Sequence, residues 1–285
     1  MTYTLEYAAE NGKKITFSIE SGYIIESMAD PTSQNISFQT SSGIRNIGAK
    51  MEAQEVEPKR ISITGTLLGN AEEKRRKMVH AIVPMVKATI TFDGKYKLDV
   101  WPQKTPEIER FTENPKFNFT LFAPFPYWRS ADGKAVDLLG ISKQFRFPWN
   151  ISKPSPFRFS TYTQAAYTNV FNGGTVPSKW RAEFHARTDV SRPSIRNMVT
   201  GEFVKLNMDL LAGESAVIDT TGQELSVKHY DAFGAETDAF EHLDIDSSPF
   251  DLVVGDNLLK TEAEENKEGL SVRIVYSDYV SGVWA

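Results

Sequence analysis

Stretches of alternating apolar and polar residues recur along this chain. In residues 116–121 the apolar residues all fall on one face, and they are Phe117, Phe119 and Leu121. This period of two predicts a half-buried β-strand. Pro124 and Pro126 follow and lack the amide hydrogen that a sheet ladder needs, so the strand must end there. We interpret the aromatic residues just past this stop as core packing: Phe125, Tyr127 and Trp128.

Other strand patterns flank a tight turn in the first half of the chain. Residues 89–92 and 95–101 alternate on either side of Asp93-Gly94, a dipeptide that favours a two-residue hairpin turn. A further alternating segment covers residues 60–64 and ends at Gly65. These patterns predict antiparallel strands.

A helical pattern spans about residues 70–86. Its apolar residues recur at spacings of three and four, and they are Met78, Val79, Ile82 and Val83. Asn70 is the predicted N-cap, with Glu73 at the capping-box position, and Pro84 should end or kink the helix. A single amphipathic helix among strands must lie on a sheet to bury its apolar stripe, which predicts an α+β first half.

Residues 29–58 form a polar segment with weak alternation. As a loop in a compact domain this segment would be unusually long. It is either a partly β-structured arm or a segment that orders only against a neighbouring chain. Residues 129–174 give blurred signals and suggest a crossover. We therefore expect one domain over residues 1–145 and a second over residues 146–285.

Alternation returns strongly in the second domain. The apolar faces contain Trp180, Ala182, Phe184 and Ala186 in one strand, Leu225, Val227 and His229 in a second, and Leu270, Val272 and Ile274 in a third. Turn signals at Thr200-Gly201, Thr221-Gly222 and Phe233-Gly234 separate short strands. This spacing predicts an antiparallel β-sandwich, so the fold class of the whole chain is mainly β.

Charge and composition remove several function classes. The chain has 285 residues and a net charge of −5, which argues against wrapping nucleic acid. Its dense basic cluster, residues 74–77, follows Glu72 and Glu73 at the spacing of helix ion pairs and is interpreted as a solvated helix face. The absence of cysteine excludes disulfides and thiolate chemistry. We expect no signal peptide or membrane anchor, because no segment approaches the roughly 18 apolar residues of a membrane span.

Motifs of common catalytic and nucleotide-binding sites are absent, including Gly-x-Ser-x-Gly, the P-loop and His-Glu-x-x-His. The weak metal candidate is His242, Asp244 and Asp246, which would share one face if residues 242–246 formed a strand. Alternate strand positions lie about 7 Å apart, whereas metal ligand atoms must converge to within about 2–2.6 Å. We interpret this face as exposed and polar, and expect no catalytic residue, cofactor or metal.

A glycan-binding sandwich protein is the alternative function. β-Sandwiches commonly present sugar sites, and this chain contains Trp149, Trp180, Trp284 and many tyrosines. Trp180, however, alternates in phase with Ala182 and Phe184 and is interpreted as core. A sandwich-domain hydrolase is a more distant reading, because neither His80 nor His185 has a nearby Ser or Asp in the sequence to suggest a triad, and His229 is interpreted as a core residue.

A set of residues, which we call landmarks, occurs in a characteristic order across nearly the whole chain. They are Gly65, Gly69, Pro124, Tyr127 and Trp128 in the first half, and Gly213, Asp219, Gly255 and Asn257 in the second. Each lies in a characteristic segment, such as Ala123-Pro-Phe-Pro-Tyr-Trp128 or Phe250-Asp-Leu-Val-Val-Gly255-Asp-Asn257. No single motif is specific, but the ordered set resembles the distal tail proteins of long-tailed bacteriophages and of prophage-derived tail particles.

This resemblance implies a ring-forming N-terminal β domain with one helix, and a C-terminal galectin-like β-sandwich. It implies a homo-hexameric ring at the virion tail tip, assembled after synthesis in the host bacterial cytoplasm. The ring would join the tail tube protein to the tail-associated hub protein, with DNA only passing through its lumen. The outer domain could carry baseplate parts or a receptor-binding protein. Such a structural protein is not an enzyme, holds no cofactor and binds no membrane.

Overall fold

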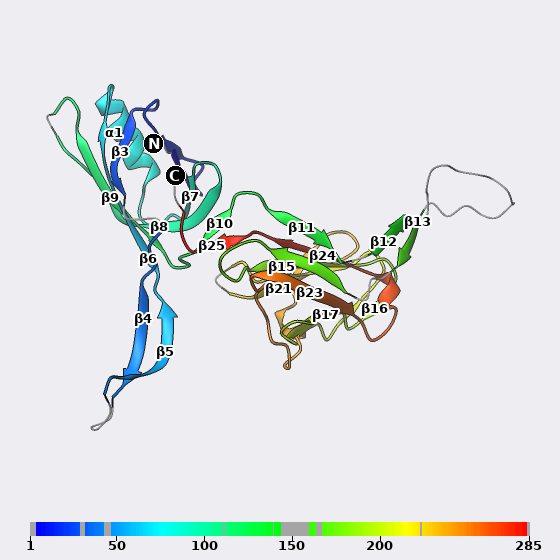
Figure 1. The fold of residues 1–285 in the computed structure, drawn as a ribbon. Helices are drawn as coiled ribbons and strands as arrows, with labels where there is room; N and C mark the ends of the chain where they lie inside the picture. The colour runs from blue at the N-terminus through cyan, green and yellow to red at the C-terminus, as the bar shows by residue number, and fades with distance from the viewer. Residues whose placement is uncertain are drawn as a thin grey trace, which may run out of the picture. The chain divides into compact units, whose positions relative to one another are not determined.

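The computed structural model describes residues 4–28, 32–42, 47–110, 112–138, 140–143, 160–163, 167–222 and 224–283, with side chains except in 140–143 and 160–163. The described elements are mostly strands, which confirms the mainly β fold class (Figure 1). The chain divides into unit 1, residues 1–132 with 279–285, and unit 2, residues 133–278. The C-terminal residues belong to unit 1 because β25 (Tyr279–Val280) pairs with β10 (Trp128–Ser130). The expected domain boundary at residue 145 stays a prediction.

Unit 1 is built on one extended antiparallel sheet. Its strands are β1 (Leu5–Ala9), β2 (Lys14–Phe17), β3 (Tyr23–Met28), β6 (Lys59–Leu67), β7 (Ala88–Phe92), β8 (Tyr96–Ile108), β9 (Lys116–Ala123), β10 and β25. Their order is β2-β1-β7-β8-β9-β6-β3, with β10 beside β8 and β25 beside β10. Asp93 and Gly94 both have positive φ between β7 and β8, as expected for the predicted hairpin turn.

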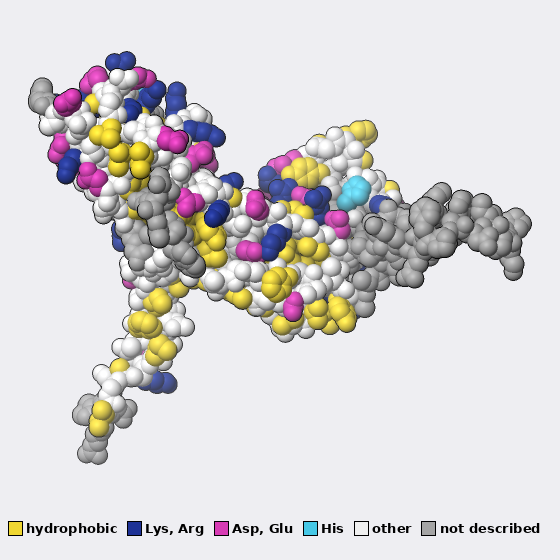
Figure 2. All heavy atoms as spheres, turned by 45° about the horizontal axis from the view of Figure 1, so that its top comes forward, with side chains coloured by type: hydrophobic (Ala, Val, Ile, Leu, Met, Phe, Trp, Pro, Cys, Tyr) yellow, Lys and Arg dark blue, Asp and Glu magenta, His cyan; other side chains and the backbone are white. Residues whose placement is uncertain are grey.

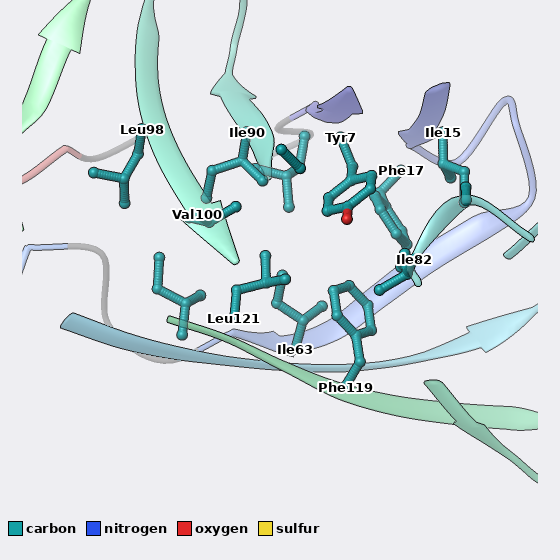
Figure 3. Close-up of a cluster of buried hydrophobic side chains, with 14 of the residues drawn as sticks. Tyr7, Ile15, Phe17, Ile63, Ile82, Ile90, Leu98, Val100, Phe119 and Leu121 are labelled. Atoms are coloured by element: carbon teal, nitrogen blue, oxygen red, sulfur yellow. The ribbon is translucent and has the colours of Figure 1, made fainter. Parts of the chain in front are cut away.

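Strand β8 joins two layers of this sheet. Residues 96–100 pair with β7, and residues 101–108 pair with β9 across register shifts that begin at Pro102. Proline is tolerated at such an irregularity because it has no amide hydrogen to donate. Side chains from β1, β2, β7 and β8 thereby face those of β6 and β9 (Figure 3). The core between them includes Tyr7, Ile15, Phe17, Ile63, Ile90, Leu98, Val100, Phe119 and Leu121.

Strand β9 has the predicted alternation. The buried residues are Phe117, Phe119, Leu121 and Ala123, and those between them are exposed or half-buried. The strand ends before Pro124, as predicted. Past this stop Trp128 is fully buried, whereas Phe125 is 40% exposed and packs edge-on against Tyr127 and Tyr279. The aromatic cluster is therefore core at Trp128 and surface at Phe125.

The helix α1 (Ala71–Ala81) is shorter than the predicted segment. Asn70 precedes it in the left-handed conformation, with φ 46° and ψ 44°, and its side chain makes no capping hydrogen bond. The predicted N-cap interaction of Asn70 is therefore wrong. The helix ends before Pro84, whose ring would clash with the preceding turn.

One face of α1 packs on the sheet, but the apolar stripe is narrower than predicted. Met78 and Ile82, the latter just past the helix, are buried in the unit 1 core, whereas Val79 is exposed. Glu73 and Lys77 form an ion pair at 2.7 Å, four residues apart as predicted.

The predicted arm contains a separate hairpin, β4 (Ile36–Ser41) and β5 (Lys50–Val56). Within the described ranges these two strands pair only with each other, and they extend away from the layers of unit 1 (Figure 1). Of the two alternatives for residues 29–58, the structure shows the partly β-structured arm.

Unit 2 is an antiparallel β-sandwich. One sheet has the order β11-β24-β15-β20-β21-β22, and the other has the order β14-β23-β17-β18. The bounds are β11 (Lys134–Asp137), β14 (Thr168–Asn172), β15 (Trp180–Ala186), β17 (Ser194–Asn197), β18 (Phe203–Lys205), β20 (Ser215–Asp219), β21 (Ser226–Tyr230), β22 (Glu236–Asp238), β23 (Gly255–Glu262) and β24 (Leu270–Tyr276). Smaller elements are β12 (Gly140–Lys143) with β13 (Ser160–Thr163), β16 (Val190–Ser191) with β19 (Asp209–Leu210), and the 3-10 turns η1 (Phe240–His242) and η2 (Lys267–Gly269).

The predicted apolar faces meet in the core of this sandwich. All the predicted face residues of β15 and β24 are buried. In the third predicted strand only Val227 is buried, while Leu225 and His229 are half-buried, because β21 lies next to the exposed edge strand β22. Much of the predicted crossover, including residues 144–159, lies outside the described residues. No helix in the described part of the chain is long and apolar enough to cross a membrane.

Tyr7 yields a prediction about the unit 1 core. Its side chain is 0% exposed, and its hydroxyl has no hydrogen-bond partner among the described residues (Figure 3). An unpaired buried polar group costs about 1–3 kcal/mol. Tyr7→Phe should therefore raise the free energy of unfolding by about 1 kcal/mol in urea titrations. Tyr23→Phe is the control, because the Tyr23 hydroxyl donates to the Lys74 carbonyl at 3.3 Å and its loss should lower that free energy. A destabilised Tyr7→Phe protein would contradict the prediction.

Burial of Tyr7 also predicts a loss of stability at alkaline pH. It raises the pKa of Tyr7 from 10.0 to about 12, because the phenolate is poorly solvated in the core. Below pH 10 the hydroxyl is protonated in both states. As the pH rises towards 12, only the unfolded chain loses this proton, so the free energy of unfolding falls. The stability difference between Tyr7→Phe and wild type should widen over this range, and a constant difference would sink the idea.

Candidate assembly site

The hairpin β4–β5 presents an apolar face to solvent. Ile36 pairs with Val56 and Thr40 pairs with Met51, so these residues share a face with Phe38. Ile36 is 48% exposed, and Phe38 and Met51 are each 56% exposed. Figure 2 shows the hydrophobic side chains along the hairpin. Because a two-stranded hairpin is at best marginally stable in water, this face is suited to being covered by a partner.

Hydrogen bonds fix the root of the hairpin. The Glu57 N–H donates to the Asn35 carbonyl at 2.9 Å. The Gln34 Nε2 donates to the carbonyl of Pro126 at 3.1 Å and to the carbonyl of Ser281. Pro126 follows β9 and Ser281 follows β25, so one side chain ties the hairpin to two distant parts of unit 1.

The surface between α1 and β2 is basic. It contains a hollow of about 570 Å³ lined by the cations Lys13, Lys14, Arg76 and Lys77, together with His80. Lys77 is neutralised by Glu73, and the hydrogen bond between them raises the pKa of Lys77. Lys13 and Arg76 form no ion pair with any described acidic residue. The hollow therefore keeps a positive character.

Landmark glycines of unit 1 lie where the backbone has little freedom. A Cβ on Gly65, in β6, would stand 2.0 Å from the carbonyl oxygen of Ile24 and 2.5 Å from the ring of Phe117. A larger residue therefore cannot fit without moving β3 or β9. Gly69 lies just before α1 with φ 64°, a conformation that glycine adopts without strain.

The remaining landmarks of unit 1 lie in the aromatic segment that follows β9, residues 124–128. Pro124 follows the last strand residue, and Tyr127 contacts the ring of Phe125. Trp128 is buried against Phe92, with ring centres 6.2 Å apart. These contacts are packing contacts.

Asn257 is the most connected landmark of unit 2 and is 0% exposed. Its Oδ1 accepts from the Val253 N–H at 2.9 Å and from the Asn197 Nδ2 at 3.3 Å. Its Nδ2 donates to the carbonyls of Val253 at 2.8 Å, Gly255 at 3.2 Å and Val170 at 3.3 Å. The side chain thus links β14, β17 and the approach to β23 within the sandwich.

The other landmarks of unit 2 shape turns. Gly213 has φ 92° and donates its N–H to the Ala186 carbonyl at 2.8 Å. Asp219 ends β20, where its Oδ1 accepts from the N–H of Thr221 at 2.8 Å and from its hydroxyl at 2.6 Å. Gly255 has φ 92° at the start of β23.

Two buried asparagines were missed by sequence reasoning. Asn172 Nδ2 donates to the carbonyls of Val176 at 3.0 Å and Leu252 at 2.9 Å. Asn197 contacts Asn257, as described above. A signal for Asn172 was present in the sequence, because it alternates in phase with buried Val170 at a strand end.

The proposed metal candidate does not form a strand face. His242 ends η1, so the strand geometry that would align it with Asp244 and Asp246 is wrong. The Asp246 N–H donates to Asp244 Oδ1 at 2.8 Å, and this bond lowers the pKa of Asp244. Over the described ranges, no group of three or more His, Cys, Asp or Glu side chains is placed to hold a metal.

The glycan alternative gains no support from Trp180. This residue is fully buried, and its Nε1 donates to the Phe250 carbonyl at 2.7 Å. Trp180 is therefore core, as predicted. Trp149 and Trp284 lie outside the described residues.

Comparisons with known proteins agree with a phage tail protein. Residues 173–278 match the family model of the siphovirus-type tail component, C-terminal domain. The SPP1 Dit protein (gp 19.1) aligns with a TM-score of 0.67 and 11% identity, covering 98% of this chain and 99% of that chain. The phage P2 baseplate in its activated conformation aligns with TM-scores of 0.56 in the calcium form, at 7% identity, and 0.55 in the strontium form, at 8%. Both alignments cover 99% of this chain, and 100% and 99% of those chains. No curated protein matches the sequence.

The fold and these comparisons make the chain similar to structural proteins of the phage tail. Residues 173–278 carry the C-terminal domain of a siphovirus-type tail component, and the whole chain has the fold of SPP1 Dit. The resemblance to distal tail proteins is confirmed by the family match over residues 173–278 and by the shared fold.

The buried network at Asn257 predicts a large stability effect. Asn257→Ala leaves several polar groups unpaired in the sandwich and should lower the free energy of unfolding by about 2–4 kcal/mol. The matched control is Asn169→Ala, because Asn169 is exposed on β14 and its side chain donates to the exposed Asp256. Its effect should stay within about 0.5 kcal/mol. Equal effects in denaturant titrations of the two variants would rule out this role of Asn257.

Proposed function

We propose that the protein forms a homo-hexameric ring at the tail tip and joins the tail tube protein to the tail-associated hub protein. The observation that carries this proposal is the likeness in fold, over 98% of the chain, to SPP1 Dit, described as a paradigm of hub adsorption apparatus in phages that infect Gram-positive bacteria. DNA passes through the lumen of the ring. The protein acts as a structural adaptor and not as an enzyme.

Unit 2 serves in this proposal as a platform for receptor-binding components. In its core, Asn257 and Trp180 donate hydrogen bonds to backbone carbonyls, so the unit is suited to act as a rigid module. We propose that this sandwich is galectin-like and that it recognises protein.

The hairpin β4–β5 supports the ring. A cyclic assembly needs a head-to-tail contact between two different surfaces of the same chain. The hairpin extends beyond the layers of unit 1 and exposes Phe38 and Met51, so each copy has an element that can reach the next.

Removal of the hairpin tests the proposal. With residues 31–57 replaced by a short Gly-Ser linker, the chain should fold but stay monomeric, because Met28 of β3 already pairs with Ile63 of β6 without the hairpin. Wild-type protein should give the mass of six copies by light scattering and rings in negative stain. Circular dichroism would check folding of the variant.

A gentler variant separates folding from assembly. Phe38→Ser/Met51→Ser should weaken the ring, whereas Leu211→Ser/Phe233→Ser removes two exposed apolar residues of unit 2 and should not. An unchanged hexamer after hairpin removal would refute the intersubunit role.

A further inference from the structure

A polar groove of about 510 Å³ lies on unit 2, on the face of the second sheet that is turned away from the sandwich core. Its lining comes from β17, β18 and β23, of which β17 and β23 pair side by side (Figure 1), and from the turn at residues 244–246. The Asp244 N–H donates to the Lys205 carbonyl at 2.9 Å and so attaches this turn to β18. Four cationic and four carboxylate side chains line the groove. Positive and negative groups are therefore interspersed along it.

Glu264 lies between two of the cations. Its Oε2 accepts from Arg192 Nη1 at 3.2 Å, and its Oε1 accepts from Lys205 Nζ at 2.8 Å. The hydrogen bond from Lys205 lowers the pKa of Glu264, so this side chain is ionised at neutral pH. Arg192 has φ 46°, a conformation uncommon for a residue other than glycine. Such backbone strain is typical of ligand-binding positions.

Arg196 is held in a fixed plane in the same groove. Its guanidinium lies 4.6 Å from the centre of the Phe203 ring, and its Nη1 donates to the Gly201 carbonyl at 3.1 Å. Its Nε lies 3.9 Å from Glu262 Oε2. The hydrogen bond from Lys260 lowers the pKa of Glu262, which keeps a second carboxylate ionised there. Because a guanidinium has five N–H donors, these contacts leave donors for a ligand.

The mixture of charges restricts the chemistry of a ligand. An anionic ligand would be repelled by the carboxylates, and a cationic ligand would be repelled by the arginines and lysines. A hydroxyl group both donates and accepts, so it can bond to a guanidinium and to a carboxylate at the same time. A ring with several adjacent hydroxyl groups matches donors and acceptors that stand side by side. The groove also has the volume of a small-molecule site.

We propose that this groove binds a neutral saccharide. Arg192 and Arg196 donate hydrogen bonds to the sugar hydroxyls, and Glu264 and Glu262 accept hydrogen bonds from them. The site goes beyond the proposed ring and is additional to the protein platform. It lies apart from Trp180, which belongs to the core.

Assembly strengthens binding at this groove without creating it. All the lining residues belong to unit 2 of one chain, so a single copy can bind. In the proposed ring, six grooves would engage a surface that carries many copies of the sugar. Such multivalent binding exceeds the affinity of one site by about 10²–10⁴-fold when the geometry allows simultaneous contact.

A glycan array probed with the full-length protein tests the proposal. The array carries neutral oligosaccharides beside their sialylated and phosphorylated counterparts. Wild-type protein should bind neutral members and should bind the charged counterparts about tenfold more weakly. Arg192→Met/Glu264→Gln removes a donor and the charge of an acceptor, and it should lower the affinity for the best neutral glycan at least about tenfold in calorimetric titrations. Glu262→Gln, which keeps the shape of the side chain, should also weaken binding.

Arg181→Met/Glu183→Gln is the matched control. Arg181 and Glu183 form an ion pair at 3.4 Å on β15, in the other sheet, and their side chains are 43% and 40% exposed, against 52% and 47% for Arg192 and Glu264. This variant should bind glycan like the wild type. Circular dichroism would check that every variant is folded.

Three results would overturn the saccharide site: no binding to any neutral glycan, a preference for the charged counterparts, or equal loss of binding in the groove and control variants. Light scattering on the same samples separates this outcome from that of the ring. A ring that binds no neutral glycan would overturn the site and leave the proposed ring standing. A monomeric chain that binds neutral glycan through the groove would do the reverse.

Discussion

Buried backbone groups of a β-sheet need hydrogen-bond partners. In unit 1, the single strand β8 supplies such partners to both layers. The first half of β8 pairs with β7, and the second half pairs with β9. The layers cannot separate without breaking bonds along the same strand. Three features depend on this arrangement: the core between the layers, the packing of α1 through Met78, and the pairing of β6 with β9. Since β5 leads directly into β6, the position of the hairpin also depends on this arrangement.

The hairpin differs from the rest of unit 1 in what stabilises it. Its strands contribute no residue to the buried core, and its apolar face remains in solvent. Hydrogen bonds from Gln34 fix where it leaves the unit, next to β9 and the returning C-terminal segment. A fixed root with an uncovered apolar face is typical of an element that is completed by assembly, and this agrees with a protein of the phage tail.

Several landmark residues constrain the backbone itself. Gly65 allows two strands to approach β6 closely, and Asn257 satisfies backbone groups of the sandwich. Neither residue points to a ligand. Both residues serve the packing and hydrogen bonding of the fold itself.

The sequence by itself determined the elements that depend on local pattern. Alternation in residues 116–121, the Asp93-Gly94 turn and the apolar face at Trp180 were predictable, because burial of one strand face imposes a period of two. Only the tertiary structure decided that β25 returns to β10 and that Asn257 meets Asn197. It also decided that α1 leaves Val79 exposed. Each of these outcomes depends on which distant segment packs against the residue, and no local pattern encodes that.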